Sequence, residues 1–189
     1  TTHRMKRGYS MASKKDRGYV HIYCGNGKGK TTTGMGLCLR AAGYGYTVLI
    51  YQFMKDNSTS ERKALAHIPG ITLVEGLPQE KFSFQMTGEE RANRKNYYEE
   101  QFRAVTEKAA RENYDVLFCD ELVYAIRAGL FDEQLLLDFL AVKPCRLEVI
   151  LTGRDPSPRL MDAADYISEI RKVKHPFDEG LPARKGIER

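Results

Sequence analysis

The stretch YVHIYCGNGKGKTTTG, at residues 19–34, constrains the fold of this chain more than any other. It joins an apolar run to a glycine-rich segment and then to Gly29, Lys30 and Thr31, which is the order of a strand, a phosphate-binding loop and a helix. The usual loop reads G-x-x-x-x-G-K-S/T, yet the residue five places before Gly29 is Cys24. The sequence therefore predicts a shortened phosphate cradle between the first strand and the first helix.

The residue types in this loop suit an anion. A helix N-terminus offers free backbone N–H groups and the positive end of the helix dipole, and glycines permit the conformations that aim such donors inward. Lys30 adds a point charge, Lys28 adds a second cation for a triphosphate, and the Thr31 hydroxyl suits Mg²⁺. A glycine-rich turn that binds nothing is the alternative, and the strand-loop-helix context disfavours it. The loop residues assigned to the nucleotide are Gly25, Asn26, Gly27, Lys28, Gly29, Lys30, Thr31 and Thr32.

A second motif supports the first. The segment DVLFCDE, at residues 115–121, is an apolar strand that ends in two adjacent carboxylates, like the acidic motif that accompanies a phosphate loop. We assign Asp120 to metal contact, directly or through water. Glu121 is open to four roles, because it could hold metal, contact ribose, orient a water molecule or cap the next helix.

Strands and helices alternate along the rest of the chain, which predicts a mostly parallel sheet in a three-layer α/β domain like those of the P-loop NTPases (RecA-like). Apolar, β-branched or aromatic runs predict strands at 19–24, 47–53, 71–75, 115–119, 146–152 and 166–173. Helices are expected at 30–42 (closed by Gly43), 60–67, 88–112, 121–142 with a break near Gly129, and 157–164. In the longest helix, Thr87 and Glu90 form a capping box, and its apolar stripe is core: Tyr98, Phe102, Val105 and Ala109.

Composition limits the remaining possibilities. A chain of 189 residues supports one domain, here 19–189, preceded by a flexible basic arm at 1–18. The arm carries six Lys and Arg residues and one Asp, which accounts for the whole net charge of +5, so we expect no specific nucleic-acid partner. No run reaches the roughly 20 apolar residues of a membrane span, and no secretory signal is recognisable, so we expect a cytoplasmic protein. The four cysteines and four histidines are dispersed and indicate neither a disulfide framework nor a zinc site.

The motifs together resemble a known family. The segments GNGKGKTT (25–32), LRAAGYGYTVLIYQFMK (39–55), DELVYAI (120–126), LTGRDP (151–156), VKHPFDEG (173–180) and KGIE (185–188) are similar to those of the ATP:corrinoid adenosyltransferases of the P-loop type. The resemblance runs from about residue 18 to the C-terminus, and the tight glycine spacing is a feature of that family. It implies transfer of the 5′-deoxyadenosyl group from ATP to the cobalt of a reduced corrinoid, which is cobalamin or a precursor, with triphosphate as leaving group. It also implies Mg²⁺, a reversed nucleotide, an electron-donating reductase or flavoprotein, and a homodimer.

The resemblance assigns further residues. Phe82 and Phe84, in the region where the family uses two aromatics to displace the axial ligand of cobalt(II), join Lys28 and Lys30 as catalytic residues. The second aromatic is often tryptophan in the family, and this chain contains none; the alternative is that both phenylalanines anchor a loop to the core. Arg40 and Arg154 are assigned to the nucleotide, and the final segment is expected to close over ATP, although related chains tend to end with an aromatic residue and this one ends with Arg189.

Two other functions remain open from the residues alone. One is a P-loop ATPase or kinase that transfers the γ-phosphate, with Glu121 positioning water or an acceptor hydroxyl. The other is a nucleotide-dependent binding protein without catalytic activity.

Overall fold

The fold is built on one parallel sheet. The computed structural model describes residues 16–79, 81 and 83–188. The sheet has six strands in the order β3-β2-β4-β5-β1-β6, and every neighbouring pair is parallel. Their bounds are β1 (Val20–Cys24), β2 (Val48–Gln52), β3 (Ile71–Leu73), β4 (Val116–Asp120), β5 (Glu148–Thr152) and β6 (Tyr166–Glu169). The prediction of a mostly parallel α/β sheet is confirmed.

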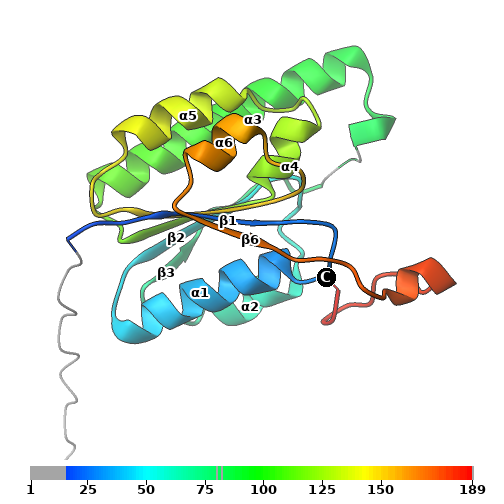
Figure 1. Cartoon of the computed structure of the whole chain (residues 1–189), viewed down its shortest axis with the longest axis horizontal. Coiled ribbons are helices and arrows are strands. Elements are labelled where there is room, and N and C mark those ends of the chain that lie inside the picture. Colours follow the sequence, from blue (N-terminus) through cyan, green and yellow to red (C-terminus); the bar gives the residue numbers. More distant parts are fainter. Residues whose placement is uncertain (1–15, 80, 82, 189) are drawn as a thin grey trace, which may run out of the picture.

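Helices cover both faces of the sheet, which gives the three layers seen in Figure 1. One face carries α1 (Lys30–Tyr44) and α2 (Ser60–Leu65). The other carries α3 (Gly88–Arg111), α4 (Leu122–Arg127), α5 (Glu133–Val142) and α6 (Pro158–Asp162). Short 3₁₀ turns η1 (Ser83–Gln85) and η2 (Pro176–Glu179) lie at the end of the molecule where the strands finish (Figure 1). No helix in the described part of the chain is long and apolar enough to cross a membrane.

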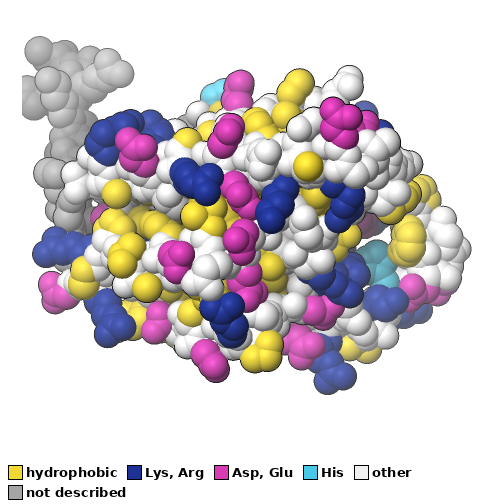
Figure 2. Space-filling view, turned by 90° about the horizontal axis from the view of Figure 1, so that it is seen from above, with side chains coloured by type: hydrophobic (Ala, Val, Ile, Leu, Met, Phe, Trp, Pro, Cys, Tyr) yellow, Lys and Arg dark blue, Asp and Glu magenta, His cyan; other side chains and the backbone are white. Residues whose placement is uncertain are grey.

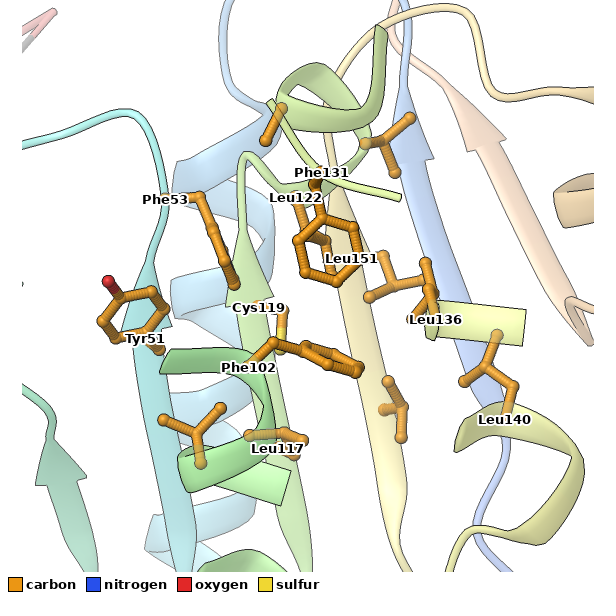
Figure 3. Close-up of a cluster of buried hydrophobic side chains, with 14 of the residues drawn as sticks. Tyr51, Phe53, Phe102, Leu117, Cys119, Leu122, Phe131, Leu136, Leu140 and Leu151 are labelled. Atoms are coloured by element: carbon orange, nitrogen blue, oxygen red, sulfur yellow. The ribbon is translucent and has the colours of Figure 1, made fainter. Parts of the chain in front are cut away.

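The core has two halves, one on each side of the sheet. Strand β4 supplies Leu117 and Cys119 to the half under α3 and α5, and Val116 and Phe118 to the half under α1. This alternation follows from the two-residue period of a strand and explains why all five residues of β4 are buried. Figure 3 shows the larger half, where Phe102 lies against Phe131 with ring centroids 5.1 Å apart.

Helix α1 lies very close to the centre of the sheet. A Cβ atom added to Gly34 would come within 2.4 Å of the Phe118 ring, which is fully buried. A Cβ atom added to Gly36, two residues further along the helix, would meet no atom of another segment within 4 Å. The contact at Gly34 therefore sets the spacing between α1 and β4, and with it the position of the loop that opens α1.

Several boundaries differ from those expected. Helix α1 continues past Gly43 to Tyr44, because Gly45 and not Gly43 takes the left-handed conformation that ends it (φ 106°). Strand β6 ends at Glu169, since the chain beyond it turns to contact the loop after β1. The break near Gly129 is confirmed: this residue has φ 70° and separates α4 from α5.

The face of the molecule covered by α3, α4, α5 and α6 carries charges of both signs. Figure 2 shows Lys and Arg side chains interspersed with Asp and Glu side chains over this face. A nucleic-acid backbone is bound by a continuous basic surface, and this face does not offer one. The basic segment at residues 1–15 lies outside the described residues, and so does the part of the arm prediction that falls on it.

Candidate functional site

The candidate site lies at the carboxyl ends of the strands, where ligands of open α/β sheets bind. A cavity of about 710 Å³ opens there. Its walls come from the loop after β1, the segment after β2, the ends of β4 and β5, and the C-terminal segment. The residues of these walls that were predicted from sequence are Asn26, Gly27, Lys28, Gly29, Lys30, Thr31, Thr32, Glu121 and Arg154.

The loop after β1 is fastened to the segment that follows β6. The Gly27 N–H donates to the Ile170 carbonyl (2.8 Å), and the Lys172 N–H donates to the Asn26 side-chain oxygen (2.8 Å). A Cβ atom on Gly25 would come within 2.4 Å of the Ile170 carbonyl oxygen. The Gly27 N–H therefore holds the loop against the edge of the sheet.

Lys30 folds back over its own loop. Its Nζ donates to the Gly27 carbonyl (2.9 Å), so the ammonium lies inside the curve of the cradle. Burial lowers the pKa of Lys30, although the nearby Glu121 carboxylate opposes this effect. Lys28 and Arg154 are exposed and line the same cavity. The loop side of the cavity therefore presents three cationic side chains, as a polyphosphate requires.

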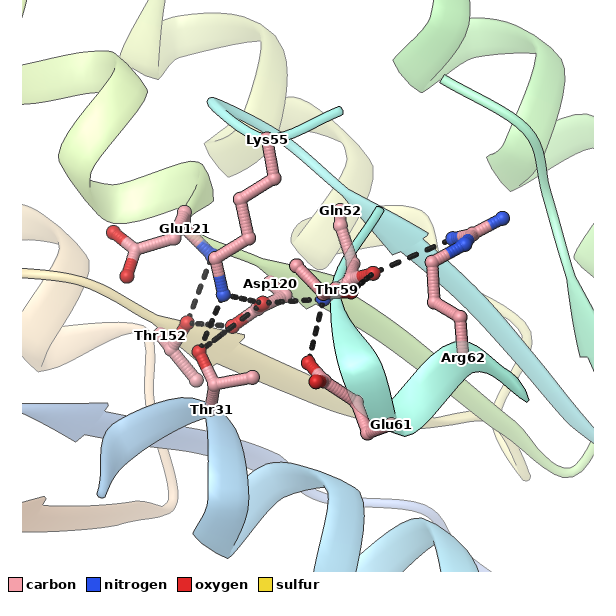
Figure 4. Close-up of polar contacts among 9 residues, drawn as sticks. All are labelled: Thr31, Gln52, Lys55, Thr59, Glu61, Arg62, Asp120, Glu121 and Thr152. Carbon is pink, nitrogen blue, oxygen red and sulfur yellow. Dashed lines mark hydrogen bonds and ion pairs between the residues drawn. The ribbon is translucent and has the colours of Figure 1, made fainter. Parts of the chain in front are cut away.

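Asp120 is the centre of the polar network drawn in Figure 4. It is fully buried, and one of its carboxylate oxygens accepts hydrogen bonds from Thr31 (2.9 Å) and Thr152 (2.6 Å). The other oxygen accepts from Gln52 (3.1 Å) and from the Lys55 ammonium (2.7 Å). Thr31 and Asp120, each assigned to the metal from sequence, are thus in direct contact, and Lys55 is a partner of both that the sequence analysis did not identify.

Glu121 takes an unusual backbone conformation. Its φ is 60°, in the left-handed region that residues with side chains rarely adopt, and its N–H donates to the Thr152 hydroxyl (2.8 Å). This turn directs the chain from β4 into α4 and leaves the Glu121 carboxylate in the cavity wall. Burial, followed by repulsion from Asp120, raises the pKa of Glu121. Such strain and such a raised pKa are typical of functional positions.

The side-chain oxygens of Thr31, Asp120 and Glu121 suit a hard cation, but there are few of them. A hydroxyl and two carboxylates match the ligands that Mg²⁺ prefers, and Mg²⁺ commonly completes its shell with substrate phosphates and water. Within the described residues, no group of three or more His, Cys, Asp or Glu side chains could hold a metal ion. A metal at this site would therefore depend on oxygens from the nucleotide.

The C-terminal segment forms the opposite wall. His175, Phe177, Leu181 and Ile187 line the cavity from this side, as does Glu188. Arg184 holds the Glu188 carboxylate in a hydrogen-bonded ion pair (2.9 Å), which lowers the pKa of Glu188 to about 2. The cavity thus has a cationic side at the loop and a largely apolar side at the chain end.

Of the described residues that were predicted for the site, four do not line the cavity: Gly25, Arg40, Phe84 and Asp120. Arg40 is exposed on α1, ten residues after Lys30, which is about 15 Å along the helix axis; the geometry of a single chain gives no support to its assignment to the nucleotide. Phe84 lies in η1 with 80% of its surface exposed, so it does not anchor a loop to the core. Phe82 lies outside the described residues.

Two residues of the polar network that sequence analysis missed come from the end of β2 and from the turn after it. Gln52 ends this strand, and Lys55 follows it by three positions. Gln52 also links Asp120 to α2, since its amide contacts Glu61 (3.3 Å) and Arg62 (3.3 Å). One available signal was position, because β2 lies beside β4 and parallel strands end at the same edge of the sheet.

Comparisons with known proteins point to one family. The family model described as ATP:corrinoid adenosyltransferase BtuR/CobO/CobP matches residues 16–189. A corrinoid adenosyltransferase of Pseudomonas aeruginosa is 28% identical over 191 residues, covering 98% of this chain and 93% of that protein. A corrinoid adenosyltransferase of Sinorhizobium sp is 31% identical over 186 residues, covering 94% and 84%.

A solved structure supports the fold alone. The KaiC-like protein of Pyrococcus horikoshii superposes with a TM-score of 0.51 at 17% identity, over 84% of this chain and 75% of that one. The match to the family model spans the loop, the carboxylate pair and the cavity walls described above. This chain belongs to the ATP:corrinoid adenosyltransferase family.

Proposed function

We propose that the protein transfers the 5′-deoxyadenosyl group of ATP to the cobalt(I) of a reduced corrinoid. The observation that carries this proposal is the match of residues 16–189 to one family of that activity, together with a cavity in which the loop of that family meets a buried carboxylate. In this reaction the electron pair of cobalt(I) forms a bond to C5′, and the bond between C5′ and O5′ breaks. Triphosphate leaves with the electrons of the broken bond, and cobalt becomes cobalt(III).

The residues of the chain supply alignment and charge in this scheme. Cobalt(I) carries no proton, so the step needs no general base. Lys28, Lys30 and Arg154 face the part of the cavity where a triphosphate would lie, and they would stabilise the negative charge that grows on the leaving group. The apolar wall from Phe177 to Ile187 would exclude water from the reacting carbon.

Mg²⁺ is the metal that fits the site. The Thr31 hydroxyl and the carboxylates of Asp120 and Glu121 are the residues that would hold it, and the Lys55 ammonium already lies between Thr31 and Asp120 as a cation. When bound with nucleotide, Mg²⁺ neutralises phosphate charge and favours departure of triphosphate.

The exposed Phe84 is proposed to act on the corrinoid and not on the nucleotide. The Phe84 side chain is 80% exposed, so most of its ring is open to a ligand or partner, and the 3₁₀ turn η1 that carries it lies at the end of the molecule where the strands finish (Figure 1). We propose that it displaces the lower axial ligand of cobalt(II), which makes reduction to cobalt(I) easier. An electron-donating reductase or flavoprotein would deliver the electron.

Two broader features complete the proposal. The protein is proposed to act as a homodimer, as the resemblance of its motifs implies, and to act in the cytoplasm, as expected from its sequence. Gel filtration with light scattering measures the oligomeric state, and fractionation of the source cells shows the compartment.

An anaerobic incubation with ATP, Mg²⁺ and chemically reduced cobalamin tests the activity. We expect a light-sensitive corrinoid spectrum and one triphosphate for each adenosylcobalamin formed. ADP and orthophosphate with an unchanged corrinoid would instead identify an ordinary P-loop ATPase or kinase and refute the proposal.

A further inference from the structure

The Lys55 side chain is aimed at the nucleotide site by the turn after β2. The Phe53 N–H donates to the Asp120 carbonyl (2.9 Å), and the Met54 N–H donates to the Tyr98 hydroxyl (3.0 Å). Met54 has φ 57°, which is unfavourable for a residue with a side chain. These contacts over-determine the turn and direct Lys55 back toward the end of β4, so its position is built into the fold.

The ammonium of Lys55 contacts two groups of the site at once. Its Nζ lies 2.7 Å from Asp120 Oδ2 and 2.8 Å from Thr31 Oγ1. The Asp120 side chain is fully buried, and 23% of the Lys55 side chain is exposed. Because a buried carboxylate needs a compensating charge, the ammonium stabilises Asp120 before any ligand arrives.

The same two oxygens belong to the residues that fit Mg²⁺. A divalent cation bound directly by Thr31 and Asp120 would lie where the ammonium now lies, and two cations cannot share that space. The site offers few other ligands that could displace an ion pair already formed, since no group of three or more His, Cys, Asp or Glu side chains that could hold a metal ion occurs in the part of the chain that the structure describes. Direct binding of the metal by Thr31 and Asp120 therefore requires Lys55 to move.

We propose that Lys55 is a positioning residue that acts as a resident counter-ion: it fills the cation position of the nucleotide-free protein and yields it only to metal that arrives with nucleotide. Lys55 lines the cavity, so the displaced ammonium can pair with phosphate oxygens. This device links metal binding to nucleotide binding and keeps the buried carboxylate neutralised between turnovers. The inference rests on the proposed function for the nature of the ligand, but not on the corrinoid chemistry.

The test measures Mn²⁺ binding, by electron paramagnetic resonance, to the nucleotide-free protein and to two matched variants. K55M removes the resident cation. K28M removes a cation that lines the same cavity but is exposed, and it controls for a general change of charge. We expect K55M to bind one Mn²⁺ at least about tenfold more tightly than the wild type, and K28M to differ from it by less than about threefold.

Two outcomes would overturn the inference. One is a K55M affinity for Mn²⁺ equal to that of the wild type, and the other is an equal gain in K55M and K28M. If K55M does not fold, K55Q takes its place, because its amide can still donate to Asp120, and the same two outcomes apply to it. Addition of Mg²⁺ alone should also raise the melting temperature of the Lys55 variant more than that of the wild type.

These results separate the inference from the proposed function. If the wild type forms adenosylcobalamin and triphosphate but K55M gains no affinity for Mn²⁺, the counter-ion role is refuted and the proposed reaction is not. A gain of Mn²⁺ affinity in K55M without adenosyl transfer by the wild type would leave the counter-ion role standing and refute the reaction.

Discussion

Gly34 and Gly36 form a matched pair on α1, the helix that presents Lys30 and Thr31. We expect G34A and G36A to change the free energy of unfolding in opposite directions. Both substitutions favour the helix by about 0.5–1 kcal/mol, because alanine loses less backbone entropy than glycine. Only at Gly34 does the new Cβ meet a fixed neighbour, since the Phe118 ring is buried and three of its atoms lie within 2.9 Å of that position.

Overpacking of this kind costs about 1–3 kcal/mol. After the helix term is subtracted, G34A should lose up to about 2.5 kcal/mol, which corresponds to a fall of up to roughly 10 °C in melting temperature for a domain of this size. G36A should instead gain about 1–4 °C. Differential scanning calorimetry of both variants measures the shifts, and circular dichroism checks that the fold is retained.

The rate of adenosyl transfer provides a second test of G34A and G36A. If α1 moves away from β4 to accommodate the methyl group that G34A introduces, the first turn of the helix moves with it. Adenosyl transfer should then fall in G34A, while G36A keeps the wild-type rate. Equal melting temperatures for the two variants would refute the claim that the contact with Phe118 sets the position of α1.

Three further results are expected. K30A should abolish adenosyl transfer, because the leaving triphosphate loses its nearest charge; near-normal turnover by a folded K30A protein would defeat this assignment. F84A should lose more activity in assays that start from cobalt(II) than in assays that start from chemically reduced cobalt(I), and equal losses would argue against a role in reduction. The pKa of Glu121 is raised by burial and by Asp120, so the native state loses stability as the pH rises from the unfolded pKa through the folded one. E121Q should therefore be more stable than the wild type to urea at neutral pH, with a smaller difference near pH 5; a pH-independent difference would contradict the shift.

Sequence reasoning located the elements that local chemistry determines. The capping box of Thr87 and Glu90 is present, and Tyr98 and Phe102 face the core, because capping and helical periodicity depend on residues a few positions apart. The contact of Thr31 with Asp120 joins distant segments, and it follows from topology: both residues lie at the carboxyl ends of strands of one parallel sheet.

What sequence reasoning missed depends on contacts between distant segments. Nothing local in Gly27 reveals that its N–H binds Ile170, and nothing local in Lys55 reveals that a left-handed Met54 turns it toward Asp120. The end of α1 was misjudged because either Gly43 or Gly45 could have adopted the left-handed conformation, and the choice falls on the glycine whose N–H meets the last carbonyls of the helix.

The position of β1 in the sheet has a consequence for how the chain acquires its site. This strand is the first in the sequence, yet both of its neighbours, β5 and β6, begin after residue 147. During synthesis on the ribosome, the strand that precedes the nucleotide loop therefore has no partner on either edge until most of the chain has emerged. The loop itself is fastened only when Ile170 and Lys172 reach Gly27 and Asn26. An incomplete chain thus lacks the residues that fasten the nucleotide loop, and these residues lie just beyond the last strand of the sheet.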